Sequence, residues 1–205
     1  QREFHAAGKR YRERLLMAAN QVGKTLCAGA EVAMHVTGRY PSWWDGYVFD
    51  SPRPWWVGGI TSESTRDNPQ RILLGRNDAW GTGMIPKDAM RGDPAMRRGV
   101  VDAVDHVIVK FGGGGDVQAG ETSLAFKSYD QGREKWQGET LGGVWFDEEC
   151  DEEIYSEGLT RTNVGLCPVM MTFTPLKGMS SVVKRFLIDH VDGTNVTQMT
   201  IDDAA

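Results

Sequence analysis

The sequence predicts an α/β fold in which helices flank a mainly parallel β-sheet. Short apolar, strand-like runs alternate with segments of helical periodicity, an order typical of such sheets. The 205 residues are 40% hydrophobic and 25% charged, which suits one domain with a substantial core. Three cysteines, none in a Cys-x-x-Cys pair, argue against a disulfide framework or a zinc ribbon and indicate a reducing, intracellular setting.

The first strand–loop–helix unit lies near the start of the chain. An apolar run at residues 15–19 predicts a strand, and residues 24–36 carry small and apolar side chains at helical spacing. Gly38 is placed to end this helix. The apolar positions on one helix face are Leu26, Ala30, Ala33 and Met34.

The rest of the chain continues the alternation. Residues 55–60 predict a buried strand, and Thr61 or Ser62 then caps a helix that reaches about Leu74. Residues 75–99 predict long loops with one short helix. The remaining predicted elements are a hairpin of strands 104–111 and 122–126 across a run of four glycines, strands at 141–146, 169–173 and 195–201, and a helix at 181–190.

Residues 18–25 match the phosphate-loop pattern G-x-x-x-x-G-K-[ST], except that Ala18 replaces the leading glycine. Such a loop turns backbone N–H groups and a helix N-terminus toward phosphate oxygens. We expect Lys24 to reach the β- and γ-phosphates and the Thr25 hydroxyl to take one position on Mg²⁺. The expected contacts to the nucleotide come from Ala19, Asn20, Gln21, Val22, Gly23, Lys24 and Thr25.

Acidic residues follow the apolar run that ends at Phe146. We expect Asp147 to hold Mg²⁺ through water and Glu148 to orient and activate the attacking water. The later acids, Glu149 and residues 151–153, are interpreted as a solvated turn or a helix start. A two-metal nuclease site would need carboxylates from separated segments, which one contiguous run does not supply.

These motifs resemble the large terminase subunit of tailed bacteriophages, the ATPase that drives DNA into the procapsid. The phosphate loop and the acidic motif (Val-Trp-Phe-Asp-Glu, 144–148) are similar to those of the family. Residues 172–178 look like its coupling motif, in which a polar residue, here Thr174, senses the γ-phosphate. The segment that starts at Gln1 resembles its glutamine-containing adenine-contact segment.

The resemblance implies a RecA-like P-loop NTPase of the ASCE class with a β-hairpin insertion, and a Mg²⁺-dependent ATPase that uses ATP. It also implies double-stranded DNA, a portal protein and the small terminase subunit as partners, with no membrane, in the host cytoplasm at the procapsid portal. The subunits would form a ring when assembled and could be monomeric when isolated. Residues 1–205 would be one ATPase domain, from which the natural N-terminus and a C-terminal nuclease domain are missing. Asn20 stands where some members have an arginine, so a charge-stabilising arginine must come from elsewhere; Arg133 is the first candidate and Arg161 the second.

Two other functions stay open. One is a helicase or another DNA-stimulated ATPase, for which a second RecA-like lobe would be expected. The other is a module that binds ATP without turnover, against which Glu148 argues. The net charge of −5 requires any nucleic-acid contact to be local. The tryptophan pairs at 43–44 and 55–56 are expected in core packing and subunit contact, and the four scattered histidines suggest no metal cluster.

Overall fold

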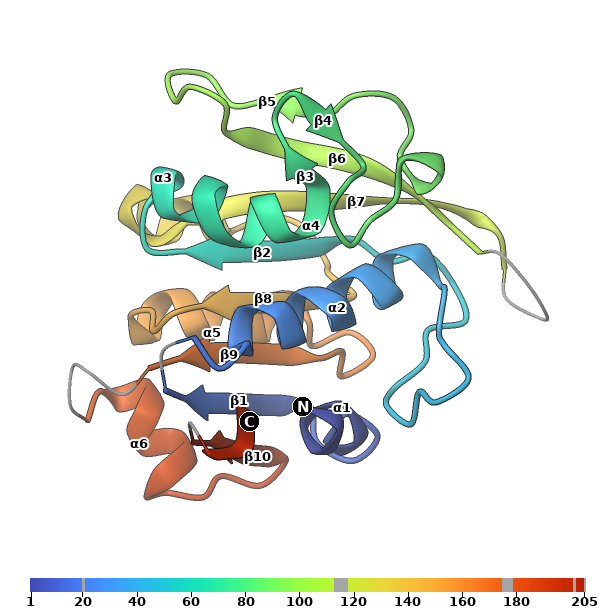
Figure 1. Cartoon of the computed structure of the whole chain (residues 1–205). Coiled ribbons are helices and arrows are strands. Elements are labelled where there is room, and N and C mark those ends of the chain that lie inside the picture. The colour runs from blue at the N-terminus through green and yellow to red at the C-terminus, as the bar shows by residue number, and fades with distance from the viewer. Residues whose placement is uncertain (20, 113–117, 175–178, 201, 205) are drawn as a thin grey trace.

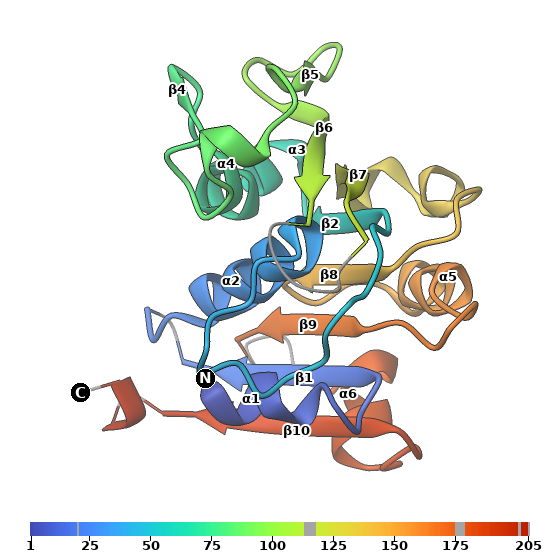
Figure 2. The ribbon, with the colours of Figure 1, turned by 90° about the vertical axis from the view of Figure 1, so that its right-hand side faces the viewer.

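A computed structural model describes residues 1–19, 21–112, 118–174, 179–200 and 202–204. Within these residues, eight strands form one sheet in the order β10-β1-β9-β8-β2-β7-β6-β5 (Figure 1). Helices α2, α3 and α4 cover one face of the sheet, and α5 and α6 cover the other (Figure 2). This arrangement confirms the predicted α/β class.

The elements have the following bounds. The strands are β1 (Glu13–Ala18), β2 (Trp55–Gly59), β3 (Gly75–Arg76), β4 (Ala79–Trp80), β5 (Ala95–Met96), β6 (Val104–Phe111), β7 (Gly120–Ser128), β8 (Gly143–Asp147), β9 (Val169–Phe173) and β10 (Thr194–Met199). The α-helices are α1 (Arg2–Ala7), α2 (Lys24–Thr37), α3 (Ser62–Thr65), α4 (Arg71–Leu74), α5 (Glu152–Arg161) and α6 (Ser181–Leu187). A π-helical turn, Arg66–Gln70, joins α3 to α4, and short 3-10 turns cover Lys87–Ala89, Tyr129–Gln131, Arg133–Trp136 and Asp202–Ala204.

The sheet is parallel from β10 to β7, and β6 and β5 continue it in the antiparallel sense. The predicted hairpin is confirmed as β6 and β7, although the tip at residues 113–117 lies outside the described residues. This hairpin is part of the main sheet, because β7 also pairs in parallel with β2. The hairpin therefore widens the sheet at the side farthest from β1.

Strand order places the two predicted motifs close together. Strand β9 lies between β1, which precedes the phosphate loop, and β8, which ends at Asp147. Register pairs Asp147 with Thr172, and Met17 with Phe173. Since parallel strands end at the same edge of a sheet, the loop after β1 and the acids after β8 meet at one edge.

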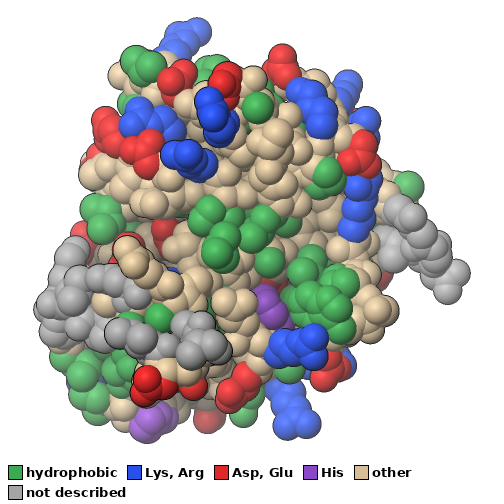
Figure 3. Space-filling view, in the orientation of Figure 1, with side chains coloured by type: hydrophobic (Ala, Val, Ile, Leu, Met, Phe, Trp, Pro, Cys, Tyr) green, Lys and Arg blue, Asp and Glu red, His purple; other side chains and the backbone are tan. Residues whose placement is uncertain are grey.

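Of the four positions that the sequence indicates as the apolar face of α2, only Ala33 is buried, and most of the inward face is made by other residues. Leu26 is 52% exposed, and the buried positions include Glu31 and His35. Apolar side chains gather over α2 on the surface in Figure 3, where Ala30 and Met34 line a shallow hollow with Met84, Ala33, Thr37, Arg39 and Pro86. The inward face can be polar because its charged groups are paired with one another, as described below.

The helix predicted from residue 61 or 62 to Leu74 is confirmed, with its cap at Thr61 and a π-helical turn around Pro69. The capping box joins the Thr61 side chain to the Ser64 N–H. Helix α2 ends at Gly38, as predicted, with a left-handed φ of 67°. Helix α1 is not predicted from the sequence.

The sheet separates two apolar cores. Trp55 packs in the core on the α2 side, and Trp56 packs in the core on the α5 side, because successive strand residues point to opposite faces. The prediction of core packing is thus confirmed for this pair, whereas Trp43 is 46% exposed. No helix in the described part of the chain is long and apolar enough to cross a membrane.

Candidate nucleotide-binding site

The loop between β1 and α2 has the backbone shape of an anion cradle. Gly23 is the N-cap residue of α2 and adopts a left-handed φ of 85°, and Gln21 has a φ of 63°. Lys24 is the first residue of the helix, and most of its side chain is buried. Ala19 and Val22 lie on either side of Asn20, which is outside the described residues.

A chain of hydrogen bonds holds Asp147 beside this loop. The Thr172 hydroxyl donates to Asp147 Oδ1 at 2.9 Å and accepts a hydrogen bond from Trp145 Nε1 at 2.9 Å. The Thr25 side chain is also hydrogen-bonded to Asp147. The two residues predicted to share a metal ion, Thr25 and Asp147, are therefore in contact.

Burial raises the pKa of Asp147 to about 7, and the neighbouring charge of Glu148 acts in the same direction. The Thr172 hydrogen bond, the charge of Lys24 and the Thr25 hydrogen bond lower the pKa and partly offset burial. The carboxyl group thus depends on its donors and on nearby positive charge to remain ionised near neutral pH.

Glu148 faces the phosphate loop from the end of β8. Its backbone has a left-handed φ of 70°, and its N–H donates to the Thr172 carbonyl at 2.7 Å. Its Oε1 atom lies 3.6 Å from Lys24 Nζ, and its Oε2 accepts a hydrogen bond from the Thr174 N–H at 3.5 Å. The structure therefore brings Lys24, Glu148 and Thr174 together, while residues 175–178 of the predicted coupling motif lie outside the described residues.

Tyr129 holds the backbone of the acidic pair, Asp147 and Glu148. Its buried hydroxyl lies 3.0 to 3.2 Å from the carbonyl oxygens of Gly58, Asp147 and Glu148. Tyr129 has no recognisable signal in the sequence, because a tyrosine just after a strand forms no distinctive pattern. Thr172 is likewise not predicted to have a role, because threonine is common in strands and its pairing with Asp147 becomes visible only in the sheet.

The N-terminal segment lies against the loop. A Cβ atom built on Gly23 would lie only 2.9 Å from Gln1 Nε2, so the glutamine amide occupies the space beside this glycine. Gln1 also caps α1, since its carbonyl accepts a hydrogen bond from the His5 N–H at 3.2 Å.

Both candidate arginines pair with Glu157 of α5, and Arg161 is itself the last residue of that helix. Arg133 Nε lies 2.8 Å from Glu157 Oε1, and Arg161 Nη2 lies 3.6 Å from Glu157 Oε2. About half of the Arg133 side chain is exposed, which leaves it accessible from outside the subunit.

The later acids begin a helix. Glu152 and Glu153 lie in the first turn of α5, where negative charge is favourable, as one of the two sequence interpretations expects. Among the residues that the structure describes, no group of three or more His, Cys, Asp or Glu side chains could hold a metal ion.

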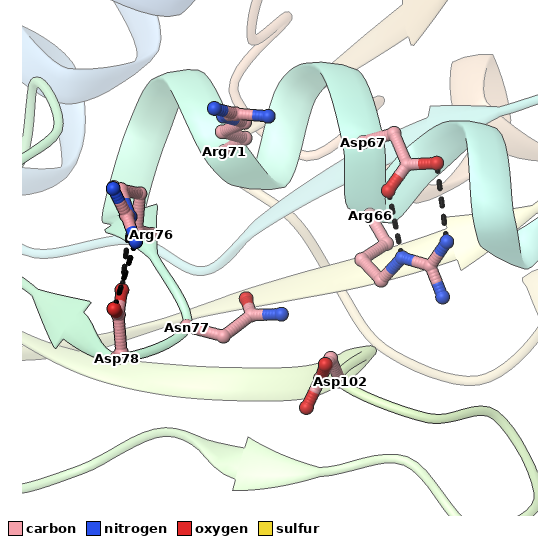
Figure 4. Close-up of a pocket in the computed structure, with 8 residues that line it drawn as sticks. Arg66, Asp67, Arg71, Arg76, Asn77, Asp78 and Asp102 are labelled. Carbon is pink, nitrogen blue, oxygen red and sulfur yellow. Dashed lines mark hydrogen bonds and ion pairs between the residues drawn. The ribbon is translucent and has the colours of Figure 1, made fainter.

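A different hollow, of about 430 Å³, lies where the α3–α4 helical segment meets the β3–β4 hairpin (Figure 4). Two of its three arginines are paired within it, Arg66 with Asp67 and Arg76 with Asp78. Because these charges neutralise each other locally, the hollow is a weaker candidate for a nucleotide than the loop before α2.

Strand β1 leads into the phosphate loop, and the acidic pair lies at the end of β8, which one strand, β9, separates from β1 in the sheet. This arrangement in a mainly parallel sheet defines a P-loop NTPase of the RecA-like class. The model of the family described as "Terminase large subunit, T4likevirus-type, N-terminal" matches residues 15–205. The chain belongs to this large terminase subunit family.

Curated relatives and solved structures agree with this assignment. The large terminase subunit of Salmonella phage P22 is 45% identical over 222 residues, which cover 100% of this chain and 44% of the relative. That of Enterobacteria phage LP7 is 32% identical over 151 residues, covering 72% of this chain and 31% of the relative. The chain thus spans less than half the length of these relatives.

The large terminase ATPase domain of Thermus phage P74-26, solved as a mutant, superposes with a TM-score of 0.61 at 13% identity. The match covers 95% of this chain and 78% of that one. The large terminase of a thermophilic bacteriophage, solved in complex with ADP, has the same TM-score at 15% identity, and the match covers 95% of this chain and 42% of that one. These likenesses show that the fold is shared.

Proposed function

We propose that this chain hydrolyses ATP with Mg²⁺ and that the hydrolysis powers movement of viral double-stranded DNA into a procapsid. The observation that carries the proposal is the meeting of Lys24, Thr25, Asp147 and Glu148 at one edge of the sheet. A phosphate loop alone would bind a nucleotide, whereas the adjacent acidic pair supplies what hydrolysis needs. The same pair argues against a module that only binds ATP.

The residues present fit a magnesium ion. The Thr25 hydroxyl and the Asp147 carboxylate are hard oxygen donors in mutual contact, and they leave the remaining positions to phosphate oxygens and water. A cation here would also offset the burial that raises the pKa of Asp147. When bound, Mg²⁺ would neutralise charge on the β- and γ-phosphates.

The protein side chains would then divide the work. Lys24 would bind phosphate oxygens from the N-terminus of α2. The carboxylate of Asp147 would face Thr25, because the hydrogen bond from Thr172 fixes the orientation of the carboxylate. Glu148 would orient the attacking water and accept its proton, which its left-handed backbone and partial exposure allow. Thr174, whose N–H binds Glu148, would connect the γ-phosphate position to the chain that follows.

Nucleotide selection and assembly are the finer parts of the proposal. Gln1, beside Gly23, would contact the adenine base. Arg133 would act on the site of a neighbouring subunit in a ring at the portal, since about half of its side chain is exposed. DNA, the portal protein and the small terminase subunit are the proposed partners, in the host cytoplasm.

The Lys24→Ala variant tests the proposal. It removes the lysine charge from the loop, so binding of ATP and its hydrolysis should both fall to background in equilibrium binding and phosphate-release assays. The matched control is Lys184→Ala, which removes a lysine charge on α6 whose side chain is about half exposed. Parental ATP turnover by Lys24→Ala would refute the assignment of the phosphate loop.

A further inference from the structure

A fully buried ion pair lies under the N-terminal helix. Arg14 on β1 and Glu31 on α2 have no exposed surface, and both guanidinium Nη atoms bind the Glu31 carboxylate. Burial alone would raise the pKa of Glu31, but the charge of Arg14 and hydrogen bonds from His35, His5 and Arg14 hold it well below the usual value. Glu31 is therefore an ionised carboxylate that accepts a hydrogen bond from Arg14, His5 and His35.

This acceptor fixes the protons of the two histidines that face it. His5 Nδ1 lies 2.7 Å from Glu31 Oε2 and His35 Nε2 lies 3.3 Å from Oε1, so each of these nitrogens donates. His5 Nε2 lies 3.6 Å from Sγ of the Cys27 thiol. That thiol keeps its proton, because burial and the charge of Glu31 raise the pKa of Cys27 to about 12.

The cluster joins three elements around the candidate site. Arg14 Nη1 donates to the Phe4 carbonyl at 2.8 Å, and the His5 ring binds Glu31, so two consecutive residues of α1 are bound to β1 and α2. The guanidinium also stacks over the Phe4 ring, 4.8 Å from its centroid. A helix of six residues is too short to be stable by itself, so these contacts determine where α1 lies.

We infer that the Arg14–Glu31–His5 chain is a positioning device that holds α1, and with it the Gln1 amide, over the phosphate loop and so sets selectivity for the nucleotide base. Three links carry the inference: β1 and α2 flank the loop, His5 lies one helical turn after Gln1, and the Gln1 amide lies beside Gly23. The inference rests on the proposed function of Gln1 as a base contact.

The test compares two histidines that make the same kind of bond. His5→Leu and His35→Leu each remove one donor to Glu31, but only His5 lies on α1. The 205-residue chain and its variants are titrated with ATP, GTP and tripolyphosphate in the presence of Mg²⁺. The ratio of the GTP to the ATP dissociation constant reports the base contact, and tripolyphosphate reports the loop alone.

We expect His5→Leu to lower the GTP-to-ATP ratio about five-fold or more and to leave the affinity for tripolyphosphate within about two-fold of the parent. Gln1→Ala should have the same effect, and the double variant should be no worse than either single variant. His5→Asn, whose amide can replace Nδ1 as the donor, should restore the ratio. His35→Leu should keep the parental ratio even where it lowers the melting temperature.

A parental ratio in His5→Leu together with a lowered ratio in Gln1→Ala would overturn the positioning role and leave the proposed function intact. An unchanged ratio in Gln1→Ala would overturn the base contact and, with it, this inference. If the parent binds none of the three ligands, the proposed function is instead overturned.

If His5→Leu does not fold, amide hydrogen exchange of α1 in the parent decides. Protection of α1 by ATP but not by tripolyphosphate supports the inference, and equal protection by both ligands contradicts it.

Discussion

Replacing Thr172 with valine preserves the shape of a buried strand residue and removes one hydroxyl. The Asp147 carboxylate then loses a donor and the Trp145 indole N–H loses its acceptor. An indole N–H left buried without an acceptor costs about 1–3 kcal/mol, which lowers the melting temperature by roughly 2–12 °C in a domain of this size. The fold should therefore survive the change in a weakened form.

The effect on the metal should be larger than the effect on stability. A hydrogen bond to a charged group contributes about 1.5–3 kcal/mol, equivalent to about one to two pKa units. Losing it would raise the pKa of Asp147, already about 7, to roughly 8 or 9. At pH 7 the ionised fraction would fall about 5- to 50-fold, and the apparent affinity for Mg²⁺ would fall with it. The defect should shrink at pH 9, where the carboxyl group ionises to a large extent in parent and variant alike.

The assay is ATP hydrolysis as a function of Mg²⁺ concentration at pH 7 and pH 9. Thr122→Val is the matched control, because it makes the same change in a strand of the same sheet at a buried hydroxyl that has no hydrogen-bond partner among the described residues. The control should retain the parental Mg²⁺ dependence and should equal or exceed the parent in stability. A Thr172→Val variant that activates at parental Mg²⁺ concentrations at pH 7 would refute the positioning of Asp147 by Thr172.

Three further outcomes are expected. Tyr129→Phe should lower kcat and leave the KM for ATP near its parental value, because the hydroxyl supports the backbone of Asp147 and Glu148; a fall in thermal stability alone would limit Tyr129 to packing. ATPase activity per subunit should rise with protein concentration and should do so less in Arg133→Ala; full activity in dilute monomer would contradict an arginine supplied by a neighbour. Thr174→Val should change ATP affinity by no more than a few-fold while uncoupling hydrolysis from DNA movement, and packaging at the parental rate would exclude that role.

The sheet and the phosphate loop could be predicted because their signals are local. Apolar runs mark β1, β2, β8 and β9, and the lysine of the loop follows the first of them at the expected spacing. The position of the acidic pair also follows from local sequence, since Asp147 comes directly after a buried apolar run. Strand ends in a parallel sheet meet at one edge, which brings these local signals together.

The parts that could not be predicted depend on pairing between distant residues. Thr172 pairs with Asp147 only because β9 lies next to β8 in the sheet, although 25 residues separate the two in the chain. The face of α2 that packs inward is misjudged because Glu31 is polar in the sequence but neutralised by Arg14 in the fold. Helix α1 is missed because six residues carry little periodicity and tertiary contacts hold it.

Separating ATP binding from ATP turnover at Glu148 tests the central claim most directly. Glu148→Gln keeps the size and polarity of the side chain and removes the carboxylate that faces Lys24. In a single-turnover experiment with radiolabelled ATP and Mg²⁺, the variant should bind ATP at least as tightly as the parent and release no phosphate above background. Phosphate release at the parental rate would show that the acid at the end of β8 does not act on the attacking water, and would contradict the account.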